Sequence, residues 1–208
     1  MPDREHVLNK VRSALGRHAG QAPSPPPAPR LVIPEMSAAE RLRALGENFQ
    51  GRLVHAASKD EARDWVASAQ QGRSAIASSD PLLEELGIYS LPGVHSAITD
   101  SAEIRRLCSQ VDLGITSASY ALADPGALVM LSSAREDRLM SLLPPSHIVL
   151  LPAERILTGL DELFTILPDP AAETSSMVLI GGPSRTGDIE MTLTVGVHGP
   201  KQVTVVVF

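Results

Sequence analysis

The chain has 208 residues, a length that suits one sizeable α/β domain with a full hydrophobic core. Its 18 Lys plus Arg against 24 Asp plus Glu give a net charge of −6. This acidic balance argues against a broad binder of nucleic acid or anionic membrane, because both need positive charge to replace counterions. Aromatic residues make up only 3% of the chain, which disfavours a base-stacking surface.

The chain has one cysteine, Cys108. One thiol cannot form an intrachain disulfide, a Cys-rich zinc site or an iron–sulfur cluster on the usual ligands. We therefore expect no redox cofactor here, and no metal, since the six histidines are scattered without ligand spacing. The first residues are charged and lack an apolar core, so we also expect no export signal and a cytoplasmic location.

Residues 3–15 place apolar side chains at helical spacing, and Gly16 follows as a stop signal. The next segment is rich in proline, which favours an extended tether. The sequence thus predicts three parts: an N-terminal helical arm (1–20), a Pro-rich linker (21–36) and an α/β domain (37–208). The arm either packs on its own domain or binds a partner, a second copy of the chain included.

From residue 37 onward, helices and strands alternate. Residues that can cap a first turn predict helices beginning at Ser37, Ser58, Asp80 and Asp100. Further helices are expected over about 152–167 and 188–195, and strands over 52–56, 74–77, 113–116, 128–131, 147–151, 177–180 and 202–208. Continuous apolar strands between helices predict a three-layer α/β fold with a mostly parallel sheet flanked by helices. Ligands of such sheets bind outside the carboxyl ends of strands, which directs attention to the loops 116–126 and 181–188.

The densest polar cluster spans residues 181–190, between an expected strand and an expected helix. Glycines allow close backbone approach, and a helix N-terminus offers unpaired amides to an anion. Hydroxyls and a guanidinium suit a carboxylate or phosphate. The candidate ligand-binding residues here are Gly182, Ser184, Arg185, Thr186 and Glu190, and Asp188 is a candidate catalytic acceptor of a hydroxyl hydrogen bond or a proton. The alternative interpretation is a well-capped helix whose acidic first turn complements the helix dipole.

A second candidate is His198, which Gly199 and Pro200 follow. Its ordinary pKa lies near neutrality, so it could serve as a general acid or base. The alternative interpretation is a histidine that caps a turn or lies in the core.

A third, hydroxyl-rich cluster spans residues 116–127 and supplies the candidate ligand-binding residues Thr116, Asp124 and Gly126. Its alternative interpretation is an ordinary turn.

These clusters together resemble the lactate-utilization protein C family, the YkgG-like LUD domain. The match is most specific over residues 181–208, where Gly-Pro-Ser-Arg-Thr-Gly-Asp-Ile-Glu is followed by Gly-Val-His-Gly-Pro and a closing strand. It extends upstream through the Arg-x-x-Ser-Leu-Leu-Pro segment at 138–144 and the His-Ile-x-x-Leu segment at 147–151. The segment 123–127 departs from the family pattern, because Asp124 shortens a carboxylate and Pro125 and Ala127 replace hydroxyl residues.

The resemblance implies the fold shared by ribose-5-phosphate isomerase, glucosamine-phosphate deaminase and CoA transferases. It also implies a role in lactate oxidation beside iron–sulfur partner proteins that hold the redox centres. The first hypothesis is therefore a non-redox component of L-lactate utilization that binds lactate, pyruvate or a partner. The second is a free-standing small-molecule enzyme or binding protein for a sugar phosphate, a CoA ester or a nucleotide. The third is a scaffold protein with a vestigial pocket.

Overall fold

The computed structural model describes residues 4–16, 34–49, 52–133, 138–189 and 192–208. Its contacts divide the chain into two units, residues 1–31 and 32–208. In the first unit, helix α1 (Arg4–Ala14) has no buried side chain, and Val7, Val11 and Leu15 are about half exposed. The predicted amphipathic helix is thus present, whereas the predicted linker lies largely outside the described residues. None of the described helices has the length and apolar composition that crossing a membrane would require.

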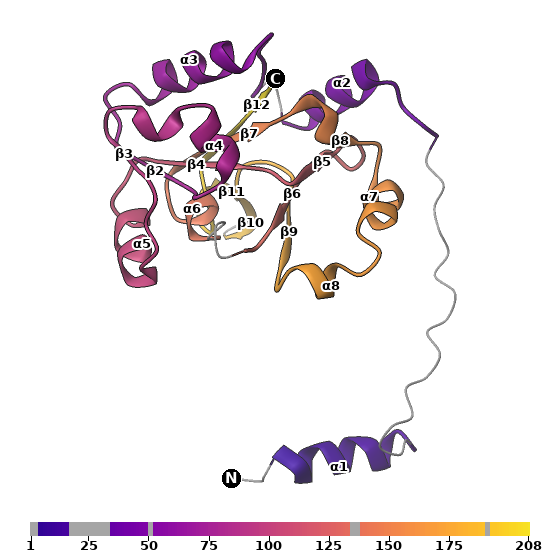
Figure 1. Ribbon diagram of the computed structural model, residues 1–208. Coiled ribbons are helices and arrows are strands. Elements are labelled where there is room, and N and C mark those ends of the chain that lie inside the picture. Colours follow the sequence, from indigo (N-terminus) through magenta and orange to yellow (C-terminus); the bar gives the residue numbers. More distant parts are fainter. Residues whose placement is uncertain (1–3, 17–33, 50–51, 134–137, 190–191) are drawn as a thin grey trace. The chain divides into compact units, whose positions relative to one another are not determined.

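A six-stranded, entirely parallel sheet forms the centre of the second unit (Figure 1). Its strand order is β1-β12-β7-β4-β2-β3. The strands are β1 (Leu53–His55), β12 (Gln202–Val207), β7 (Ser146–Leu151), β4 (Leu113–Ser117), β2 (Ala75–Ala77) and β3 (Val94–His95). The central strands are continuously apolar because helices or a second sheet cover both faces. The predicted parallel α/β sheet is confirmed.

Helices α3 (Lys59–Gln70) and α4 (Pro81–Glu85), with the short 3-10 turn η1 (Ile88–Ser90), cover one face of this sheet. They bury Ile115, Ile148 and Leu150. Each helix begins at the predicted residue: Ser58 accepts a hydrogen bond from the Glu61 backbone N–H, and Asp80 accepts one from Leu82. These side chains satisfy amides that the first turn leaves unpaired.

Two groups of elements cover the opposite face of the six-stranded sheet. Helices α5 (Ser101–Cys108) and α6 (Leu139–Leu142) cover β2 and β4 and bury Ile76 and Cys108. A four-stranded sheet and helix α2 (Ala38–Asn48) cover β7 and β12 and bury Val149 and Val205. The second sheet has the order β8-β5-β6-β9, with β8 (Ile156–Leu157), β5 (Tyr120–Leu122), β6 (Ala127–Leu131) and β9 (Met177–Ile180). The 3-10 turn η2 (Ala153–Arg155) precedes β8.

The outer face of the second sheet carries helix α7 (Leu160–Ile166), which buries Leu163 against Leu122 and Val129. Helix α8 (Pro170–Glu173) then leads to β9. The single helix expected over 152–167 is therefore wrong in its first half. Residues 153–155 form η2 and Ile156–Leu157 pair with β5, so the helix begins only after Gly159.

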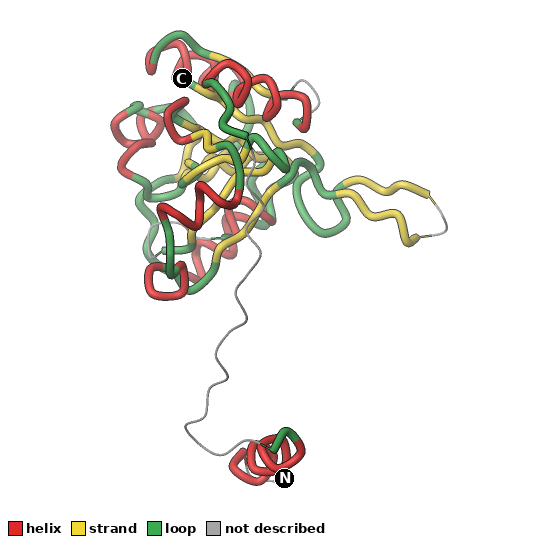
Figure 2. Tube along the Cα trace, turned by 90° about the vertical axis from the view of Figure 1, so that its right-hand side faces the viewer, coloured by secondary structure: helices red, strands yellow, loops and turns green. Residues whose placement is uncertain are grey.

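The helix expected over 188–195 is also wrong. Strands β10 (Arg185–Ile189) and β11 (Thr192–Val195) pair antiparallel and form a hairpin that projects from the body of the domain (Figure 2). The strand at 177–180 is confirmed, but it belongs to the second sheet and pairs antiparallel with β6. The segment around Ser184 therefore does not present a helix N-terminus to a ligand, contrary to the expectation from its sequence.

Gly114 allows α6 to pack directly on β4. A Cβ atom at this position would overlap the backbone carbonyl of Met140 and lie 3.3 Å from Cγ of Pro144. We expect Gly114→Ala to lower the free energy of unfolding by about 3 kcal/mol, because the backbone of α6 must shift to admit the methyl group. Denaturant unfolding measures this loss. The matched control is Gly46→Ala in α2, where the nearest neighbour is Cβ of Leu53 at 3.9 Å and the stability should be unchanged or slightly higher.

Candidate functional site

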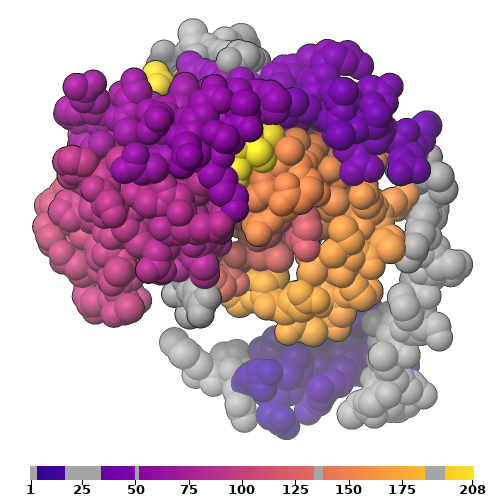
Figure 3. Space-filling view, turned by 45° about the horizontal axis from the view of Figure 1, so that its top comes forward, coloured from indigo at the N-terminus to yellow at the C-terminus, as the bar shows by residue number. Residues whose placement is uncertain are grey.

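The topology places a switch point at the carboxyl ends of β2 and β4. The chain leaves β2 toward α4, on one face of the sheet, and leaves β4 toward β5, on the opposite face. Neighbouring parallel strands whose connections depart to opposite faces mark the switch point where ligands of such sheets bind. In Figure 3, where the top of Figure 1 is tilted forward, the last segment of the chain, in yellow, reaches the surface between purple and orange segments.

A carboxylate and a hydroxyl meet at this switch point. The Ser117 hydroxyl, at the end of β4, donates a hydrogen bond to Oδ2 of Asp80 at 2.7 Å. The other oxygen of Asp80 accepts from the Leu82 backbone N–H, also at 2.7 Å, so one side chain caps α4 and links it to the end of β4. The Tyr89 hydroxyl donates to the carbonyls of Ser78 and Asp80 at 2.8 and 3.0 Å. This arrangement holds the Asp80 carboxylate in one orientation, where it can accept a hydrogen bond from a ligand hydroxyl.

Asp80 was predicted only as a helix cap, and Ser117 only as part of a hydroxyl-rich segment. The sequence signal that could have identified them is a run of polar residues, Ser78 to Asp80, directly after a buried strand. The pairing itself joins residues 37 positions apart and depends on the order of strands in the sheet.

Thr116 is fully buried on the opposite face, where its Oγ1 lies 2.9 Å from Nε2 of His147. Burial lowers the pKa of His147 from 6.5 to about 3, so the imidazole is neutral at physiological pH. Its Nδ1 has no hydrogen-bond partner among the described residues. The predicted ligand-binding residue Thr116 is thus part of a buried polar pair between β4 and β7, and a ligand cannot reach it without rearrangement.

The base of the β10–β11 hairpin brings two of the predicted motifs together. The Ser184 backbone N–H donates to the carbonyl of Pro200 at 3.0 Å, and Gly196 donates to the carbonyl of Ser184 at 2.9 Å. The backbone N–H of His198 donates to Oγ of Ser184 at 3.3 Å. Since the side chains of Arg185 and His198 are both exposed, this base presents a guanidinium, a hydroxyl and an imidazole at the surface.

The remaining predicted residues lie in other places. Gly126 faces the start of the 181–184 segment, because a Cβ atom on Gly181 would lie 3.9 Å from the carbonyl oxygen of Gly126. Asp124 is exposed in the turn between β5 and β6, and its backbone N–H donates to the carbonyl of Thr158 at 3.0 Å. Thr186 and Asp188 lie on β10, away from a helix terminus, and Glu190 lies outside the described residues.

The described residues contain no group of three or more His, Cys, Asp and Glu side chains arranged to hold a metal ion. Cys108 is 1% exposed within α5 and packs against Ile76 and Val111. The thiol is therefore a core residue.

Comparison with known proteins gives concordant results. The family described as the LUD domain matches residues 39–208. The chain is 33% identical to the lactate utilization protein C of Halalkalibacterium halodurans, with 95% of this chain and 94% of that protein covered. It is 30% identical to the Bacillus subtilis protein of the same name, with 95% and 92% covered.

The chain belongs to the LUD domain family. Among solved structures, a DUF162 family protein from Deinococcus radiodurans superposes with a TM-score of 0.62 at 18% identity, over 83% of this chain and 98% of that one. That likeness concerns the fold alone. Within this LUD domain, the motif residues divide between the buried Thr116–His147 pair and the exposed hairpin base around Ser184.

We expect the buried His147 to make the LUD domain sensitive to acid. Its pKa in the folded protein is about 3, against 6.5 for an unperturbed histidine, so below pH 6.5 the unfolded chain binds a proton that the folded one excludes. The free energy of unfolding should therefore fall as the pH drops below 6.5, with a slope that approaches about 1.4 kcal/mol per pH unit from this group.

Denaturant unfolding at a series of pH values, from neutral to mildly acidic, measures this slope. The control is His147→Gln, which can still bond Thr116 but does not titrate, and its stability should depend less on pH in this range. Equal pH dependence of the two proteins would contradict the assignment.

Proposed function

We propose that this LUD protein is a component of L-lactate utilization that carries no redox centre and acts together with iron–sulfur partner proteins. The observation that carries the proposal is the similarity over nearly the whole chain to proteins named lactate utilization protein C. The cysteine content supports the assignment of the redox centres to the partners. Oxidation of lactate to pyruvate releases two electrons, and the single thiol of this chain, Cys108, is buried in the core and cannot hold a cluster that would accept them. The partners would accept those electrons.

We further propose that the hairpin base binds the small carboxylate. The Arg185 guanidinium is exposed directly after Ser184, and a guanidinium binds a carboxylate through two parallel hydrogen bonds. The imidazole of His198, whose backbone is tied to the Ser184 hydroxyl, would hold or move the proton of the lactate hydroxyl. Gly182 and Thr186 flank these residues, and Asp188 follows on the same strand as the alternative acceptor.

The partner proposal predicts that the full chain binds cluster-bearing proteins of lactate utilization. We expect a tagged chain, mixed with them at micromolar concentration and low salt, to co-elute in size-exclusion chromatography. The visible absorbance of the clusters reports the partner. An unrelated ferredoxin is the control for non-specific binding, and a chain that elutes alone under these conditions would contradict the proposal.

The ligand proposal predicts stabilisation by L-lactate or pyruvate. A ligand present at about ten times its Kd adds about 1.4 kcal/mol to the free energy of unfolding, which raises Tm by about 3–6 °C for a domain of this size. We expect this shift in thermal unfolding of the wild type and its loss in Arg185→Ala. Arg52→Ala, which removes another exposed arginine, should keep it. Stabilisation by a sugar phosphate, a CoA ester or a nucleotide but by neither carboxylate would favour a free-standing enzyme or binding protein instead.

A further inference from the structure

A groove of about 920 Å³ lies along helices α5 and α6, beside strand β9. Guanidinium groups and apolar side chains line it together, among them Arg105, Arg106, Arg138, Leu142, Leu143 and Val178. We call these six residues the arginine groove. It shares no lining residue with the Asp80–Ser117 pair or with the hairpin base at Ser184.

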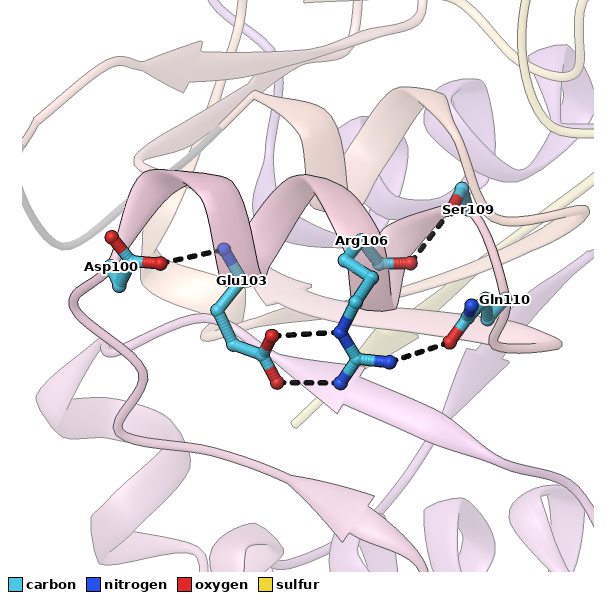
Figure 4. Close-up of polar contacts among 5 residues, drawn as sticks. All are labelled: Asp100, Glu103, Arg106, Ser109 and Gln110. Carbon is cyan, nitrogen blue, oxygen red and sulfur yellow. Dashed lines mark hydrogen bonds and ion pairs between the residues drawn. The ribbon is translucent and has the colours of Figure 1, made fainter.

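One of the three arginines is already neutralised within α5. Asp100 accepts a hydrogen bond from the Glu103 backbone N–H and so caps the helix (Figure 4). The Glu103 carboxylate then accepts two hydrogen bonds from the Arg106 guanidinium, at 2.8 and 2.6 Å. A third N–H of Arg106 reaches the side-chain oxygen of Gln110 at 2.8 Å. The donors of Arg106 are therefore directed along the helix surface toward its own neighbours.

The other two arginines differ from Arg106. Among the described residues, neither Arg105 nor Arg138 lies within ion-pair distance of a carboxylate. The Arg138 guanidinium makes one long contact, 3.4 Å to the hydroxyl of Ser176. Both side chains are exposed, so two positive charges face the solvent at one groove of a chain whose net charge is −6.

The apolar part of the groove is also uncovered. Leu142 and Leu143, at the end of α6, are 40% and 46% exposed, and Val178 lies beside them at the edge of the second sheet. A small anion would neutralise the guanidinium groups but would leave these leucines in water. A protein surface that carries both carboxylates and apolar side chains would cover the leucines and pair the charges, and arginine is enriched at the centres of such interfaces.

We propose that the arginine groove is the docking surface for an iron–sulfur partner, through a partner segment that carries acidic and apolar side chains. This assignment rests on the proposed function, which supplies the partner. We infer such a segment from charge complementarity, since its carboxylates would pair with Arg105 and Arg138. Its apolar side chains would contact Leu142 and Leu143.

The test compares two double charge reversals in the full chain. Arg105→Glu/Arg138→Glu changes the groove. Arg43→Glu/Arg52→Glu makes the same change of net charge on α2 and beside β1, outside the groove. We expect the groove variant to raise the Kd for the partner at least about tenfold, and the control to change it less than about twofold. Binding is measured by titration at low and moderate salt, and the salt dependence should be weaker in the groove variant.

A further variant, Leu142→Gln, tests the apolar part and should raise the Kd at least about threefold. Circular dichroism and thermal unfolding establish that each variant is folded. If the wild type binds the partner and the groove variants bind equally well, the groove assignment is wrong and the proposed function stands. If the wild type does not bind the partner, the proposed function is wrong, and the docking assignment that rests on it is wrong as well. If the charge reversal spares partner binding but abolishes stabilisation by L-lactate or inorganic phosphate, the groove is a small-anion site and the docking proposal is overturned.

Discussion

The position of β12 between β1 and β7 is the constraint on which the rest of the domain depends. The last residues of the chain pair in parallel with Leu53–His55 on one side and with Ser146–Leu151 on the other. Val203, Val205, Val206 and Val207 are almost completely buried, and they contribute to the cores on both faces of the sheet. Without β12, β1 would pair with none of the described strands. The hydrophobic cores under α2 and under α3 would each lack the valine side chains of β12.

The same strand also positions the proposed ligand residues. To enter β12 in this register, the chain must pass Pro145, whose carbonyl accepts a hydrogen bond from the Lys201 backbone N–H. That passage places Pro200 against the Ser184 backbone and His198 beside the Ser184 hydroxyl. The geometry of the hairpin base is therefore a consequence of how the central sheet closes. Residues 14 positions apart meet there because β10 and β11 leave the domain and return to the same point.

Local sequence signals predicted local structure well and long-range structure only in part. Ser37, Ser58, Asp80 and Asp100 each cap the helix that they were expected to begin, because capping involves atoms only two or three residues apart. The helix expected over 188–195 is replaced by strands, and Thr192 to Val195 do alternate in the manner of a strand. The Asp80–Ser117 contact could not be predicted from the sequence, because it depends on the order of strands in the sheet, which local patterns do not encode.

Arg105 and Arg106 show how one step along a helix separates two roles. Successive residues of a helix point about 100° apart, so only Arg106 lies on the side where Glu103 and Gln110 can bind it, at positions i−3 and i+4. Arg105 is directed away from them and remains uncompensated within the described part of the chain. A positive charge that is paired with a carboxylate of its own chain produces little electrostatic field beyond that pair. An acidic protein therefore attracts an acidic partner only through positive charges that are not paired in this way. Arg105 and Arg138 form no ion pair within the described residues and lie beside exposed leucines. They thus concentrate at one groove an attraction that the overall negative charge of the chain would otherwise oppose.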